Sequence, residues 1–356
     1  MKNRLELSIL TPAVLIMILS LATFYSIDFN IFRQQLTFFI VALVGYFVFL
    51  NIDYKILGFY SKYLYYLMIA VLLLLFLIGV EARGAVRWID IFGIRIQFSE
   101  IMKPFFVIFM ASRLTQDDSR SLGKFLKTIL LILPIFFLIL KQPDLGNTMI
   151  YILVAFFMLL LYGFPIRYFI SIGSIVLVLL PLIFNLLAPY QKQRIMTFIN
   201  PSSDPLSSSY NVVQSLISIG SGGFFGRGFG EGTQSILKFL PERHTDFIFA
   251  TISESLGLLG GLLLIGFYFY LMIGIYKIKS YVDDEFSNLV LTGSYFLLLA
   301  HIFLNIGMNI GIVPIVGVTL PFASYGGSSL LTNFIILGII SSIKFDFSRE
   351  RSMVIR

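Results

Sequence analysis

Residues 240–261, LPERHTDFIFATISESLGLLGG, place an acid directly before a long apolar run. A carboxylate at membrane depth is costly unless it serves a site, and partial desolvation raises its pKa toward that of a usable base. Arg243 and His244 lie close to Asp246 in the sequence and would oppose that shift. Charge placement leaves two interpretations of Asp246 equally open. It is a catalytic base or proton carrier, or it caps the helix that follows.

A second group of polar side chains lies in residues 80–100, VEARGAVRWIDIFGIRIQFSE, and extends to Lys103. Alternating apolar residues predict a short hairpin, and FSEIMKP predicts a helix start with Ser99 as the N-cap. Glu100 and Lys103 would be neighbours on that helix. A local ion pair with an interfacial tryptophan is one interpretation. The other interpretation is a site that binds an anionic lipid headgroup while a tryptophan stacks on a sugar. Its candidate residues are Arg87, Trp88, Arg95, Gln97, Glu100 and Lys103.

Three further features favour structural roles. Asp144, in QPDLGNTMI, precedes an apolar run and is predicted to be its N-cap. The glycines of residues 220–235, GSGGFFGRGFGEGTQS, lack the Gly-Lys-Ser/Thr ending of a phosphate-binding loop. In residues 305–334, glycine and proline interrupt an apolar stretch, which is tolerated at membrane depth where the backbone is buried in protein or lines a cavity.

The composition indicates a polytopic membrane protein. Hydrophobic residues make up 58% of the 356 and charged residues 13%, and the mean hydropathy is +0.91. The chain has no cysteine, which excludes thiolate chemistry and Cys-ligated metal sites, and its two histidines are too few for a His-rich metal site. Its formal charge of +7 is typical of basic loops between membrane spans, so nucleic acid is not a predicted partner.

Spanning helices need about 20 apolar residues, and about ten stretches are candidates. They lie at 8–27, 32–50, 62–80, 100–113, 125–140, 146–163, 166–188, 246–276, 287–310 and 326–344. We therefore predict an all-α polytopic membrane protein with about ten transmembrane helices in a single integral membrane domain, residues 1–356. A long extracytoplasmic loop, residues 189–245, would join helices 7 and 8. The run after Asp246, roughly 45 Å as a helix, exceeds a core of about 30 Å and must tilt, bend or project.

Basic residues predict the orientation, because short cytoplasmic loops are rich in Lys and Arg. If the spans alternate, one side collects Lys2, Arg4, Lys55, Lys62, Arg113, Arg120, Lys124, Lys127, Arg167, Lys277, Lys279, Lys344, Arg349, Arg351 and Arg356. Both termini would then be cytoplasmic. The first span is interpreted as a retained signal anchor. The motif-rich segments would face the outside.

Five motifs occur in a family-specific order and together cover nearly the whole chain. They are AVRWI at 85–89, IQFSEIMK at 96–103, QPDLG at 142–146, GFGEGTQSILKFLPERHTDFIFATISESLGLLG at 228–260 and NIGMNIGIVPIVGVTLPFASYGGSS at 305–329. In combination they resemble the SEDS family (shape, elongation, division and sporulation). GTQS followed by FLPERHTDF is most similar to its rod-shape, elongation branch. Phe98 replaces a proline common in the family, which we expect to alter a local turn only.

The resemblance implies a peptidoglycan glycosyltransferase that polymerises lipid II, an undecaprenyl-pyrophosphate-linked disaccharide-pentapeptide. It would work during elongation on the outer face of the cytoplasmic (inner) membrane, among membrane lipids, with a class B penicillin-binding protein, a transpeptidase, as partner. The resemblance also implies that Asp246, in HTDF, is the catalytic aspartate. Trp88, Glu100 and Lys103 match family positions in the first outer loop.

The chemistry of the transfer agrees with this assignment. Forming a β-1,4 link from an α-linked sugar pyrophosphate requires inversion, which one base and cations near the pyrophosphate can achieve in a single displacement. Asp246 is the candidate base. Candidate substrate contacts are Arg87, Trp88, Gln97, Glu100, Lys103, Arg194, Glu242 and Arg243. The resemblance also suggests a divalent cation, Mg²⁺ or Mn²⁺, on the pyrophosphate. No motif in the sequence identifies its ligands.

Two other functions fit part of the sequence. A lipid II flippase would also have about ten spans, Gly/Pro-broken helices and intramembrane acids. However, the motifs cluster on the predicted outer side, whereas a flippase also needs headgroup-binding charge at its inner mouth. A scaffold for cell-wall enzymes is the third interpretation, in which Asp246 only caps its helix.

Overall fold

The computed structural model describes residues 5–82, 85–91, 94–187, 189–199 and 208–354. The predicted all-helical membrane fold is confirmed, and each predicted span corresponds to a helix. These helices are α1 (Leu7–Ile27), α2 (Phe29–Asn51), α4 (Ser61–Ile78), α6 (Lys103–Leu114), α7 (Leu122–Lys141), α8 (Leu145–Tyr162), α9 (Ile166–Leu186), α13 (Ile248–Ser280), α14 (Glu285–Asn309) and α15 (Gly327–Val354). Among the described residues, seven helices are long and apolar enough to cross a membrane, and α4 and α9 contain shorter apolar stretches.

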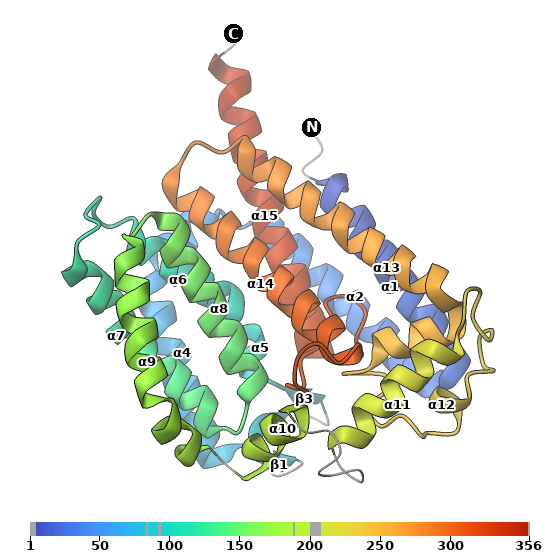
Figure 1. Cartoon of the computed structure of the whole chain (residues 1–356). Coiled ribbons are helices and arrows are strands. Elements are labelled where there is room, and N and C mark those ends of the chain that lie inside the picture. Colours follow the sequence, from blue (N-terminus) through green and yellow to red (C-terminus); the bar gives the residue numbers. More distant parts are fainter. Residues whose placement is uncertain (1–4, 83–84, 92–93, 188, 200–207, 355–356) are drawn as a thin grey trace.

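Helix pairs distant in sequence form the core. Helix α15 packs along α2, α13 along α1, and α14 against α8 and α6 (Figure 1). The start of α1 and the end of α15 lie together at one end of the bundle. The strands and α10 lie at the opposite end, and the short helix α3 (Tyr54–Phe59) connects α2 to α4. The predicted loop 189–245 contains three helices: α10 (Pro189–Ile199), α11 (Ser208–Ser221) and α12 (Thr233–Ile236).

A small antiparallel sheet follows α4. Strands β1 (Val80–Ala82), β2 (Ala85–Ile91) and β3 (Ile94–Ile96) lie in that order, and Ile89 pairs with Ile96. The predicted hairpin is therefore confirmed. The prediction that Ser99 is an N-cap is wrong, because α5 (Phe98–Ile101) begins one residue earlier and its N-cap is Gln97.

Helix α13 is broken at Gly257, which has φ +70° and ψ −164°. This conformation is essentially restricted to glycine. The portion after the break, residues 258–280, spans roughly 34 Å as a helix, close to the thickness of a hydrocarbon core. The apolar stretch after Asp246 is therefore bent at Gly257, and residues 248–256 form a separate helical segment that follows Asp246 directly.

The backbone of the glycine-rich loop, residues 222–230, forms hydrogen bonds with the residues on both sides of this break. The N–H groups of Arg227 and Gly228 donate to the carbonyls of Glu254 and Ser255, each at 3.0 Å. The N–H of Leu258 donates to the carbonyl of Gly223 at 2.9 Å. The loop therefore satisfies backbone groups that the broken helix leaves without helical partners.

Candidate active site

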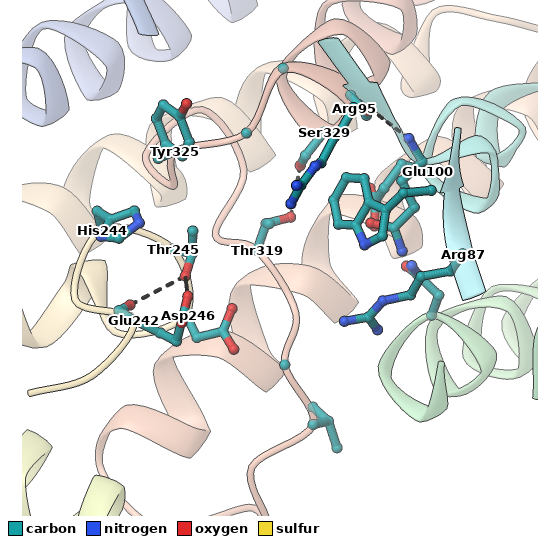
Figure 2. A pocket seen from close by; sticks show the side chains of 18 of the residues that line it. Arg87, Arg95, Glu100, Glu242, His244, Thr245, Asp246, Thr319, Tyr325 and Ser329 are labelled. Atoms are coloured by element: carbon teal, nitrogen blue, oxygen red, sulfur yellow. Dashed lines mark hydrogen bonds between the residues drawn. The ribbon is translucent and has the colours of Figure 1, made fainter. Parts of the chain in front are cut away.

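A cavity of about 1220 Å³ opens at the end of the bundle that carries the sheet. One wall is formed by the residues before α13 and the other by β2, β3 and α5 (Figure 2), and Arg194 of α10 also lines the cavity. The connection between α14 and α15, residues 310–326, is irregular and passes between the two walls. This agrees with the expectation of a broken segment beside a cavity.

Asp246 lies outside the helix that it was predicted to begin. Helix α13 starts at Ile248 with Phe247 as its N-cap, so Asp246 does not occupy the capping position. The N–H groups of Thr245 and Phe247 both donate to the carbonyl of Glu242 at 3.1 Å, which folds residues 242–247 into a tight turn. The half-exposed Asp246 carboxylate points into the open space (Figure 2).

The connection 310–326 holds this turn in place. The Ser324 hydroxyl donates to the carbonyl of Thr245 at 2.6 Å, and the Tyr325 N–H donates to the carbonyl of His244 at 2.8 Å. The Tyr325 ring lies edge-on to the His244 ring. Burial raises the pKa of the Tyr325 phenol, so it stays neutral and donates to the Gln34 side chain.

Gly317 brings the connection close to two charged groups. A Cβ atom at this position would lie 3.4 Å from Asp246 Oδ2 and 3.6 Å from Arg194 Nη1. Arg194, on α10, therefore lies beside the same part of the connection as Asp246. Gly317 has φ +69°, a conformation that disfavours side chains.

The facing wall is organised by Asp144. Its Oδ2 accepts from Gln97 Nε2 at 2.6 Å and from Asn147 Nδ2 at 2.8 Å, and its Oδ1 lies 3.6 Å from Arg87 Nη1. Oδ1 also accepts from the Asn147 N–H, which confirms the predicted N-cap of α8. One carboxylate that is 2% exposed thus orients three cavity-lining side chains. Arg87 and Arg95 point into the same space as Asp246 (Figure 2).

Glu100 lines the cavity, and Lys103 lies behind it. The Lys103 side chain is 1% exposed, and its Nζ donates to Glu100 Oε1 at 2.7 Å. Nζ also lies 2.8 Å from His301 Nε2, and His301 Nδ1 lies 3.0 Å from the carbonyl oxygen of Thr319. A carbonyl only accepts, so Nδ1 carries the imidazole proton and Nε2 accepts from Lys103.

The cavity brings most of the sequence-predicted residues together. Its lining includes Arg87, Trp88, Gln97, Glu100, Arg194, Glu242 and Asp246. Lys103 and Arg243 are not among the lining residues. Burial lowers the pKa of the Arg243 guanidinium, while the carboxylates of Asp28 and Glu242 oppose this effect. Glu254 is buried and accepts from the N–H groups of Gln234 and Ser235, at the start of α12.

Sequence reasoning missed a polar row on α14. His301, Asn305 and Asn309 recur every fourth residue, so they share one helical face, and each is at most 1% exposed. The amide Nδ2 atoms of both asparagines donate to the carbonyl of Asp246 at 3.0 Å. The four-residue spacing of polar residues in an apolar span was the available signal.

Sequence comparison places these features in a known family. The family model for cell cycle proteins of the FtsW, RodA and SpoVE type matches residues 4–349. Peptidoglycan glycosyltransferase MrdB of Escherichia coli K12 is 35% identical over 347 residues, which cover 94% of this chain and 93% of the relative. Stage V sporulation protein E of Bacillus subtilis is 32% identical over 327 residues, covering 90% and 88% of the two chains.

Solved structures agree in fold. A chain from a peptidoglycan synthase complex, studied for its structural coordination of polymerization and crosslinking, is 26% identical with a TM-score of 0.84 over 95% of this chain and 97% of that one. The rod shape determining protein RodA of Thermus thermophilus, 24% identical, matches with a TM-score of 0.72 over 96% of each chain. The chain belongs to the SEDS family, the FtsW, RodA and SpoVE cell cycle proteins.

Proposed function

We propose that this protein is a peptidoglycan glycosyltransferase that polymerises lipid II during cell elongation. The observation that carries the proposal is the arrangement of charge in one cavity. The Asp246 carboxylate faces the open space from one wall, and the guanidinium groups of Arg87 and Arg95 enter it from the other (Figure 2). Family membership gives the same reaction class, because MrdB bears the name of that enzyme.

The proposed reaction is a single inverting displacement. Asp246 takes the proton from the acceptor sugar hydroxyl as that oxygen attacks the anomeric carbon of the donor. The new C–O bond forms while the bond to the pyrophosphate oxygen breaks, and the electron pair leaves with undecaprenyl pyrophosphate. Arg87, Arg95 and Arg194 supply positive charge for the departing phosphates, which guanidinium groups bind bidentately.

The cavity is large enough for a saccharide substrate. Pockets for single small molecules usually range from about 300 to 1,000 Å³, and this one is about 1220 Å³. Trp88 offers an aromatic face for a sugar, and Gln97, Glu100 and Glu242 offer hydrogen-bonding groups.

A divalent cation would have to come mainly with the substrate. Within the described residues, no three His, Cys, Asp or Glu side chains are grouped so as to hold a metal ion. Mg²⁺ at phosphate sites is often held by one or two carboxylates together with substrate phosphates. We assign no side chain of this chain to such a cation, and a bound cation would supply further charge stabilisation of the pyrophosphate.

We further propose an extracytoplasmic active site and a class B penicillin-binding protein as partner. The start of α1 and the end of α15 lie opposite the cavity, which agrees with cytoplasmic termini and an external site. The partner is supported by the related chain from a synthase complex that coordinates polymerization with crosslinking.

The test is lipid II polymerisation by the purified protein with its transpeptidase partner, comparing wild type with Asp246→Asn. The amide is isosteric but accepts no proton, so we expect the rate to fall by about 10²- to 10⁴-fold. Asp283→Asn is the matched control, because Asp283 is an exposed carboxylate just before α14, at the far end of the bundle. Normal glycan synthesis by folded Asp246→Asn would refute Asp246 as the base. Transbilayer movement of labelled lipid II without any polymerisation would favour a flippase.

A further inference from the structure

We infer that Asn309 and Asn305 form a wedge that keeps Asp246 out of α13 and aims its carboxylate into the cavity. They are positioning residues for the proposed reaction, and the inference rests on that proposed function. It starts from the backbone between Asp246 and Ala250, where the next helical hydrogen bond would form if α13 continued toward its N-terminus.

The Asn309 amide occupies the place of one helical hydrogen bond. In a continuing α-helix, the Ala250 N–H would donate to the carbonyl of Asp246, four residues earlier. Here, the Ala250 N–H donates to Asn309 Oδ1 at 3.1 Å, and Asn309 Nδ2 donates to the carbonyl of Asp246 at 3.0 Å. The side-chain amide thus bridges the two backbone groups whose direct bond would extend the helix.

Asn305 links the same carbonyl to the irregular connection between α14 and α15. Its Nδ2 donates to the carbonyl of Asp246 at 3.0 Å and to the carbonyl of Val318 at 2.7 Å. Val318 follows Gly317, which approaches the Asp246 carboxylate. One amide therefore sets the spacing between the turn that carries Asp246 and the irregular connection beside it.

Without the wedge, Asp246 would move to an unproductive face. In an extended α13, its side chain would lie above Ala250 and near Ser253, because residues four and seven apart share a helical face. Ala250 is 0% exposed and Ser253 is 3% exposed, so that face is packed inside the protein. The wedge instead leaves Asp246 half-exposed at the cavity.

The wedge is itself held rigidly. Asn305 and Asn309 are 0% exposed, and Asn309 Nδ2 also donates to the carbonyl of Asn305 at 2.8 Å. The Ser215 hydroxyl of α11 donates to the carbonyl of Asn309 at 2.8 Å. Buried amides with satisfied polar atoms have few alternative arrangements, so they can define the position of a catalytic group.

The experiment measures turnover and substrate affinity separately. Trp88 is the only tryptophan of the chain and lines the cavity, so its fluorescence reports lipid II binding without a label.

Asn309→Leu removes the two hydrogen bonds that link Asn309 to the Ala250 N–H and to the Asp246 carbonyl. Asn309→Asp keeps an acceptor for Ala250 but, when ionised, has no N–H for Asp246. Asn288→Leu and Asn288→Asp are matched controls, because Asn288 lies near the other end of α14.

We expect both Asn309 variants to polymerise lipid II about 100-fold more slowly, since a displacement of about 1 Å has that effect on positioned groups. Their Kd for lipid II should stay within about threefold of wild type, and the Asn288 controls should match wild type. If Asn309→Leu fails to fold, Asn309→Ser replaces it as the test. The serine hydroxyl is too short to span both backbone groups, so this variant should also polymerise lipid II slowly.

Two results would overturn the inference. One is turnover within threefold of wild type in any folded Asn309 variant that lacks the bridge. The other is a loss of affinity as large as the loss of turnover, which would make Asn309 a binding or folding residue. Failure of wild type itself to polymerise lipid II would instead overturn the proposed function, so the two failures are distinguishable.

Discussion

Replacing Gly257 with alanine should destabilise the protein severely through the break in α13. Gly257 has φ +70° and ψ −164°, and strain of this kind is worth about 1 to 3 kcal/mol for other residues. An added Cβ would also lie 2.3 Å from the backbone nitrogen of Gly226 and 2.5 Å from the carbonyl oxygen of Phe224. Backbone atoms cannot rotate away, so the glycine-rich loop must move.

Moving that loop loses backbone hydrogen bonds as well. The bonds from the Arg227 and Leu258 N–H groups, at 3.0 and 2.9 Å, cross between the loop and the break. Each is worth about 1 kcal/mol, so the expected total is about 3 to 5 kcal/mol. Because the first part of α13 follows Asp246, glycan synthesis should fall in parallel with stability.

Gly266→Ala is the matched control in the same helix. A Cβ atom added at Gly266 would meet no neighbouring side chain within 4 Å, so alanine fits, and its helix propensity should add about 0.5 to 1 kcal/mol of stability. The assay is denaturant unfolding in detergent, followed by circular dichroism. Equal unfolding midpoints for Gly257→Ala and wild type would refute this account of the break, as would equal destabilisation by the two substitutions.

Three further substitutions test the cavity walls. Gly317→Ala inserts a methyl group beside Asp246 in a conformation strained by about 1–2 kcal/mol, so glycan yield should fall, and an unchanged yield would contradict the close approach. Asp144→Asn removes the charge that orients Arg87, so lipid II affinity measured by tryptophan fluorescence should weaken, and unaltered affinity would argue against this role. Lys103→Met leaves the buried Glu100 without its cation, so the free energy of unfolding should fall by about 3 to 5 kcal/mol, and a wild-type midpoint would count against the pair.

Apolar runs and local pairings could be predicted from sequence because neighbouring residues decide them. The span ends agree with the helices to within about four residues, except that α15 continues to Val354, ten residues past the predicted end at 344. The Glu100–Lys103 pair follows from their spacing. The N-cap role of Asp144 was also predictable, since it depends on the next three residues.

Long-range contacts explain what the sequence did not reveal. The break at Gly257 depends on a backbone loop some 30 residues earlier. Several other glycines lie in the same apolar run, so the sequence does not indicate which of them breaks the helix. Likewise, the choice between capping and catalysis at Asp246 could not be made locally, because Asn305 and Asn309 of another helix set where α13 begins. Lys103 was predicted as a substrate contact, whereas the structure buries it behind Glu100. The sequence did not reveal this burial, because it involves a contact with His301 on another helix.

The interior of the bundle favours polymerisation over transport. A lipid II flippase needs a polar route for its headgroup between the two ends of the membrane domain. Along α14, the cavity lies at the Asn309 end, and a smaller pocket lined by Arg120 and Glu285 lies at the other. Between them, Leu291, Leu297 and Leu298 are buried, and Phe157 stacks on Phe296 with ring centroids 4.1 Å apart. Close-packed apolar side chains resist rearrangement, so residues 296–298 separate the buried polar row of His301, Asn305 and Asn309 from the end of α14 that carries the smaller pocket.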